Sequence, residues 1–109
     1  MKLPNGNRVV ISMEKLRGYC LNPEHPSGKH KARVFASALG ITAKNAENLR
    51  ELITIAAIEG EVIQQESTEF GQLFKVDWAV PAHDQVILRT LWEVALDYPH
   101  PRLVSAFIK

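Results

Sequence analysis

The chain has 109 residues, 46% of them hydrophobic and 23% charged, which is an ordinary composition for a packed globular protein. A formal net charge of +1 excludes the broadly basic surface that long nucleic acids require, so any contact with a polyanion must be local. No apolar run is long enough to span a bilayer. We expect a single domain over residues 1–109.

The first half of the chain predicts helices, after a possible short edge strand at Arg8–Ile11. Ser12 can cap a first helix that ends at Asn22. A second helix begins near Ser27 or Gly28 and ends at Leu39, before Gly40. A third is capped by Thr42 or Asn45 and stops at Gly60. The apolar stripes of these segments are Met13, Leu16 and Cys20; Ala32, Phe35, Ala36 and Leu39; and Leu49, Leu52, Ile53, Ala56 and Ala57.

After Gly60 the apolar period changes from helical to alternating, which predicts strands. Turn-forming residues separate them, at Phe70–Gln72, Pro81–Asp84 and Asp97–Pro101. The expected strands are residues 61–69, 74–80, 86–96 and 103–108. Helices followed by strands predict an α+β fold, in which about three N-terminal helices pack on a C-terminal antiparallel sheet of about four strands.

Cys20 is the only cysteine, so no internal disulfide can form. A lone thiol fits a reducing compartment, and its position on an apolar stripe predicts burial rather than catalysis. No basic segment followed by an apolar run begins the chain. We expect a cytoplasmic protein without a membrane anchor, or a module of something longer.

The four histidines do not predict a metal site, because no pair has the spacing of helical metal ligands and no second cysteine is present. The phosphate-binding loop, the dinucleotide-binding glycine pattern and the serine-hydrolase elbow are also missing. We therefore expect no metal and no cofactor. The remaining possibility for catalysis is acid–base and electrostatic chemistry by the side chains themselves.

Residues 25–33 concentrate such side chains around one turn and one helix start. His25 can carry a proton near neutral pH. Metal-free RNA cleavage by the 2′-hydroxyl needs proton carriers and cations on the phosphoryl oxygens. Candidate phosphate-holding or substrate-binding residues are Lys29, His30, Lys31, Arg33 and Arg102. The same segment also fits the solvated face of an amphipathic helix, since Ala32, Phe35 and Ala36 take the other face.

Two further candidates lie on the predicted strands. Trp92 can stack on a base, although a tryptophan at an alternating strand position is more typical of a core. Arg102 and Ser105 are three residues apart, so they point to opposite faces of a regular strand and share a site only if a bend or bulge intervenes.

Two segments of the chain resemble those of a known protein family. In the first, Tyr19, Leu21, His25, Gly28, Lys31 and Ala32 recur at fixed spacing, followed by Phe35 and Leu39-Gly40. The second runs from Trp92-Glu93 to Pro101-Arg102-Leu103 and Ser105. Together they resemble a small bacterial domain family of unknown function. That family is similar to toxin nuclease domains of the barnase–EndoU–colicin–RelE-like superfamily.

The resemblance implies a helical part on a four-stranded antiparallel sheet and metal-independent RNA cleavage. It implies catalytic roles for His25 as acid or base, Lys31 (alternatively Lys29) as phosphate holder, and Arg102 and Ser105 beside the substrate. It also implies a cognate immunity or antitoxin protein. The competing hypothesis is a non-catalytic interaction module that binds a partner through an open strand edge or an exposed sheet face, which the neutral net charge favours.

Overall fold

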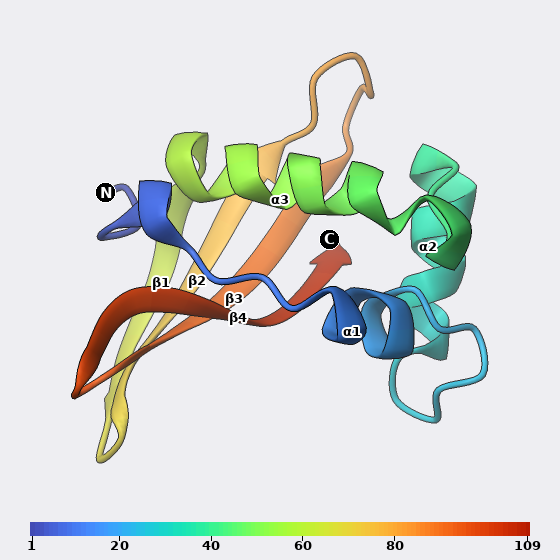
Figure 1. The fold of residues 1–109 in the computed structure, drawn as a ribbon. Helices are drawn as coiled ribbons and strands as arrows, with labels where there is room; N and C mark the ends of the chain where they lie inside the picture. The colour runs from blue at the N-terminus through green and yellow to red at the C-terminus, as the bar shows by residue number, and fades with distance from the viewer.

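The computed structural model describes residues 1–109 and has the predicted α+β order of helices followed by an antiparallel sheet. Figure 1 shows α3 lying across one face of the sheet, with α1 and α2 gathered toward one end. The helical elements are η1 (Gly6–Arg8), α1 (Met13–Lys15), η2 (Leu16–Cys20), α2 (Lys29–Leu39), η3 (Ala43–Asn45) and α3 (Ala46–Glu59). The strands are β1 (Glu61–Thr68), β2 (Gly71–Ala79), β3 (Ile87–Ala95) and β4 (Tyr98–Ile108).

The helix boundaries follow the capping residues predicted from the sequence. The Ser12 hydroxyl accepts a hydrogen bond from the Lys15 amide at 3.2 Å, and α1 continues into the π-helical turn η2. α2 ends at Gly40, whose φ of 67° is the left-handed conformation that glycine adopts readily. Thr42 and Asn45 form a reciprocal capping box before α3.

The predicted strand at Arg8–Ile11 is not formed. Instead, η1 occupies Gly6–Arg8, and Val10 makes a single parallel bridge to Arg102 at the edge of β4. The Val10 amide donates to the Pro101 carbonyl at 2.8 Å, and the Leu103 amide donates to the Val10 carbonyl at 3.0 Å. One bridge does not make a strand, but it attaches the N-terminal segment to β4.

The sheet is an antiparallel meander in the order β1-β2-β3-β4, so β1 and β4 are its edges. β2 and β3 pair without interruption, from Gly71 opposite Ala95 at one end to Ala79 opposite Ile87 at the other. The first turn lies at residues 69–70, just before the predicted one, because Gly71 already belongs to β2.

β4 begins earlier than predicted. The expected loop Asp97–Pro101 is part of the strand from Tyr98 onward, despite Pro99 and Pro101. Proline lacks an amide donor and is tolerated on an edge strand, and the β3–β4 register is irregular between Glu93 and Ala95. Pro99 and Pro101 are therefore accommodated at the sheet edge, near the point where the pairing of β4 with β3 is irregular.

A second irregularity of β4 lies at Val104, where the pairing shifts between Leu91 and Trp92 of β3. Leu91 pairs with Ser105, and Trp92 pairs with Leu103, so Val104 is the extra residue of a β-bulge. Arg102 pairs with Glu93, and alternate residues of β3 share a face. Because of the bulge, Glu93 and Leu91, the β3 partners of Arg102 and Ser105, lie on the same face of the sheet. A site shared by Arg102 and Ser105 requires this arrangement.

The core lies between α3 and the sheet. α3 buries Leu49, Ile53, Ala56 and Ala57, which are 0% exposed, as its predicted stripe indicated. The facing side chains of the sheet are Phe74, Val76, Trp78, Leu88 and Trp92. Each large apolar side chain buried in this way contributes about 1.5–3 kcal/mol to folding. None of the helices combines the length and apolar character that crossing a membrane requires.

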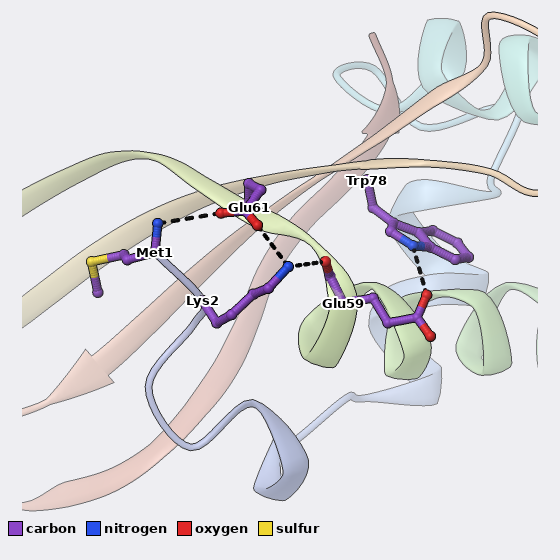
Figure 2. Close-up of polar contacts among 5 residues, drawn as sticks. All are labelled: Met1, Lys2, Glu59, Glu61 and Trp78. Carbon is purple, nitrogen blue, oxygen red and sulfur yellow. Dashed lines mark hydrogen bonds and ion pairs between the residues drawn. The ribbon is translucent and has the colours of Figure 1, made fainter.

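Polar contacts attach the N-terminal residues to the junction between α3 and β1 (Figure 2). The Lys2 ammonium lies 2.6 Å from Glu61 Oε1 and donates to the Glu59 carbonyl at 2.6 Å. The Glu59 carboxylate in turn accepts from the Trp78 indole at 3.3 Å. These contacts connect the start of the chain to the sheet, far from the candidate site described below.

Candidate functional site at the start of α2

The site is built where η2, the loop before α2, α2 itself and the end of β4 meet. Lys31, on the first turn of α2, donates hydrogen bonds to the hydroxyl of Tyr19 and to the hydroxyl of Ser105, the latter at 3.4 Å. Its ammonium also lies 5.4 Å from the ring centre of Phe107. Two predicted catalytic residues, Lys31 and Ser105, are thus brought into contact.

Lys31 has no carboxylate partner. The ion pairs of the protein involve Met1, Lys2, Arg50, Arg89 and Lys109 as the cations. Lys31 is half-buried, and the side chains to which it donates hydrogen bonds are two hydroxyl groups. An ammonium that is partly desolvated and not neutralised by a carboxylate is suited to hold an incoming anion such as a phosphodiester.

His25 is held by the backbone that begins α2. Its Nδ1 accepts hydrogen bonds from the amides of Ser27 and Gly28, both at 3.0 Å. The imidazole therefore supplies an acceptor for the Gly28 amide at the N-cap of α2 and for the Ser27 amide just before it. A ring nitrogen that accepts hydrogen bonds carries no proton, so the proton of neutral His25 is on Nε2. In this arrangement His25 is a hydrogen-bond donor through Nε2.

Tyr19 connects these groups. Its ring packs edge-on against the His25 ring, with centroids 4.9 Å apart, and its hydroxyl accepts from Lys31. The hydrogen bond from Lys31 lowers the pKa of Tyr19 below its ordinary value; burial opposes this shift, and Ser105 adds to it. No chemical role was predicted for Tyr19, although this residue begins the segment that carries the family resemblance.

Gly28 lets the loop lie close to η2. A Cβ at this position would overlap the carbonyl oxygen of Tyr19 and approach the Tyr19 ring within 3.2 Å. The loop between Leu21 and Gly28 can therefore close on Tyr19 only if residue 28 has no side chain. This explains in physical terms why a glycine stands between His25 and Lys31.

Three of the predicted binding residues of α2 lie outside this cluster. Lys29, His30 and Arg33 are exposed. Residues two positions apart on a helix do not face each other, so Lys29 and Arg33 point away from Lys31. Arg33 lines a separate hollow beside Lys44, together with Leu21, Pro23, Ala32, Ala36, Thr42 and Ala43.

Arg102 lies apart from this cluster, in a hollow of its own. It is exposed, and its guanidinium is 5.9 Å from the ring centre of Tyr98. His25, Lys31 and Ser105 do not line this hollow, and Arg102 and Ser105 are separated by roughly 10 Å along the strand. The residues that line it are Val10, Ser12, Lys15, Glu93, Arg102, Leu103 and Val104.

Trp92 is not available for stacking on a base. It is 0% exposed, and its indole donates to the Thr90 hydroxyl at 2.8 Å inside the core. The expectation that Trp92 binds substrate is therefore wrong. The face of β3 on which Trp92 lies is the one that packs into the core beneath α3.

The site offers no arrangement for a metal ion. No group of three or more His, Cys, Asp or Glu side chains is placed to hold one. Cys20 is buried, and this burial raises the pKa of its thiol. What the arrangement supplies is an ammonium, a phenol, a hydroxyl and an imidazole N–H.

Comparison with known proteins places the chain in a family. The model of DUF6883, a domain of unknown function, matches residues 2–109. The chain belongs to this family. No curated protein sequence matches it. The expectation of a domain family of unknown function is thus confirmed.

A solved structure shares the fold of this DUF6883 chain. It is a chain of a contact-dependent growth inhibition toxin–immunity protein complex from Klebsiella pneumoniae 342. The TM-score is 0.68 over 92% of this chain and 99% of that chain, at 16% sequence identity. The similarity establishes a fold that is also found in a toxin–immunity complex.

Proposed function

We propose that the chain is a toxin domain that cleaves RNA by general acid–base catalysis without a metal ion. The observation that carries this proposal is the position of Lys31, whose ammonium lies between the hydroxyls of Tyr19 and Ser105 without a carboxylate. A phosphodiester docked on Lys31 would have the Ser105 hydroxyl beside it. The fold similarity to a toxin–immunity complex adds support.

The residues have distinct proposed roles. Lys31 and Ser105 hold the phosphoryl oxygens, and they stabilise the charge that develops on them in the transition state. His25 donates its Nε2–H to the substrate, with its ring fixed by the Ser27 and Gly28 amides. Arg102 contacts the RNA backbone beyond the cleaved phosphate, from its own hollow. The exposed Lys29, His30 and Arg33 attract the polyanion to α2.

We also propose a cognate immunity protein in the cell that makes this chain. An RNA-cleaving domain needs an inhibitor there, and the cations of α2 and Arg102 favour an inhibitor with an acidic surface. The structural neighbour comes from a complex of a toxin with its immunity protein. Protection would follow if the immunity protein covers Lys31.

A test of this proposal uses the chemistry of the products. The purified chain is incubated with mixed cellular RNA in excess chelator, and the ends of the fragments are identified. Attack by the 2′-hydroxyl leaves a 2′,3′-cyclic phosphate and a 5′-hydroxyl, and these are the expected ends. Fragments with 3′-hydroxyl ends, or cleavage only after a divalent metal is added, would contradict the mechanism.

A second candidate function is a non-catalytic interaction module. It is favoured by the sheet face opposite α3, on which Leu73, Leu91 and Val104 line a shallow hollow with Lys75. The β1 strand adds an exposed edge. RNA left intact by natively folded chain over a wide protein range would favour this module over the nuclease.

A further inference from the structure

Tyr19 occupies the centre of the proposed site. Its hydroxyl accepts from Lys31, which also donates to Ser105, so groups from η2, α2 and β4 meet around one ammonium. Its ring contacts His25 from the loop before α2. The side chain is half-buried, so part of its surface stays accessible to solvent.

The groups that face Tyr19 favour its ionised form. Lys31 is the cation among them, and its hydrogen bond is the strongest influence that lowers the pKa of Tyr19. Cys20, the next residue, opposes ionisation only as a thiolate, and burial raises the pKa of that thiol. His25 is neutral in the observed hydrogen-bonding arrangement. Tyr19 therefore ionises more readily beside Lys31 than an isolated tyrosine does.

The proposed reaction lacks a proton acceptor among the other residues. His25 Nδ1 is occupied by two amide donors, and its Nε2 already carries the ring proton. Lys31 has only donors when charged, and Ser105 is a poor base. Tyr19 is the group in the cluster that can take a proton without giving up a hydrogen bond seen in the structure.

Building on the proposed ribonuclease function, we propose that Tyr19 is the catalytic base that removes the 2′-hydroxyl proton. The 2′ oxygen then forms a bond to phosphorus while the bond from phosphorus to the 5′ oxygen breaks. The departing 5′ oxygen takes a proton from water, and the hydroxide formed recovers a proton from Tyr19. The products are a 2′,3′-cyclic phosphate and a 5′-hydroxyl, with no net proton change.

A purely structural role for Tyr19 makes different predictions. If its hydroxyl only braces Lys31, removing it weakens substrate binding and leaves the pH dependence of kcat unchanged. If it is the base, removing it lowers kcat by roughly 100-fold or more. The increase of kcat with pH that follows Tyr19 ionisation would disappear as well.

The experiment compares Tyr19→Phe with Tyr98→Phe, which removes the hydroxyl of the other tyrosine of the chain. Tyr19→Phe keeps the ring that packs on His25, so it should fold. RNA cleavage is measured against pH, and phenolate absorbance in the ultraviolet is titrated in both variants, while circular dichroism monitors folding. Tyr19, observed in Tyr98→Phe, should titrate below 10.0, the ordinary pKa of a tyrosine.

The possible outcomes separate the two proposals. Loss of activity in Tyr19→Phe but not in Tyr98→Phe, with the lower titration of Tyr19, supports the base. If wild type cleaves RNA and Tyr19→Phe keeps that activity within a few-fold, the proposed role of Tyr19 is overturned. The ribonuclease proposal then still stands. The same holds if Tyr19 titrates at or above the ordinary tyrosine value of 10.0. Failure of wild type to cleave RNA overturns the ribonuclease proposal itself.

Discussion

The ammonium nitrogen of Lys31 lies 3.4 Å from the hydroxyl oxygen of Ser105, although 74 positions separate the two residues in the chain. α2 carries one and the edge strand β4 carries the other. Their contact joins the helical half of the molecule to the sheet. It also creates a half-buried cationic position without a carboxylate, on which the functional proposal depends.

Removing the Ser105 hydroxyl should reduce RNA cleavage without unfolding the protein. Ser105→Ala removes one oxygen that Lys31 contacts and one donor for the phosphoryl group. Hydrogen bonds to charged groups contribute about 1.5–3 kcal/mol, so a loss of roughly 10- to 100-fold in kcat/KM is expected. Ser67→Ala on the exposed β1 strand is the matched control and should have no effect. Equal activity of the two variants would contradict the role of Ser105.

The buried hydrogen bond between Trp92 and Thr90 should be important for stability. Thr90→Val keeps the shape of the side chain but leaves the indole N–H without its acceptor, and both residues are 0% exposed. We expect a loss of about 1–3 kcal/mol in the free energy of unfolding, measured with urea.

The double variant Thr90→Val with Trp92→Phe tests whether this cost comes from the hydrogen bond. Because Trp92→Phe removes the donor as well, the double variant should lose less stability than the sum of the two single variants. Strict additivity would mean that the hydrogen bond contributes nothing.

Two glycines near the site should respond to alanine in opposite directions. A Cβ at Gly28 would overlap the Tyr19 carbonyl, so Gly28→Ala should destabilise the protein by about 1–3 kcal/mol and lower activity by moving the loop. A Cβ at Gly18, in the helical turn η2, meets no atom within 4 Å. Gly18→Ala should therefore be neutral or stabilise by up to about 1 kcal/mol. Thermal unfolding of both variants checks the prediction, and similar shifts would contradict it.

Cys20 should make stability depend on pH in the alkaline range. Burial raises the pKa of its thiol above the ordinary 9.0, so the folded state holds the proton more tightly than the unfolded chain. Its contribution is therefore complete below that ordinary value and is lost as pH rises through the folded pKa. The difference in unfolding free energy between wild type and Cys20→Ala should shrink in this range. A constant difference would show that the thiol titrates alike in both states.

The sequence predicted the parts of the fold that local patterns determine. Ser12, Gly40 and Thr42 mark helix ends by chemistry that acts within a few residues, and the structure has those ends. The alternation of Leu88, Thr90 and Trp92 predicted the buried face of β3. Pro99 and Pro101 predicted a loop that is not there, because a strand tolerates them at a sheet edge, and edge position is a property of the whole topology.

The candidate site could be predicted only in part. Lys31 and Ser105 were named from the sequence, but their contact depends on how α2 packs against β4. The bulge at Val104 that realigns Arg102 with Ser105 leaves no local signal. Tyr19 was missed because a tyrosine on a short helical turn resembles an ordinary packing residue. Its significance lies in the ammonium that the fold brings to its hydroxyl.

The most direct measurement of the central claim compares two lysines of the same helix. Lys31→Ala and Lys29→Ala remove the same charge, from the site and from the exposed face of α2 respectively. Cleavage of mixed RNA in chelator is measured for both variants and for wild type, at equal concentrations of folded protein. If Lys31 holds the phosphate, Lys31→Ala should lose roughly 100-fold or more and Lys29→Ala a few-fold at most. Equal losses in the two variants, or no cleavage by the wild type, would contradict it.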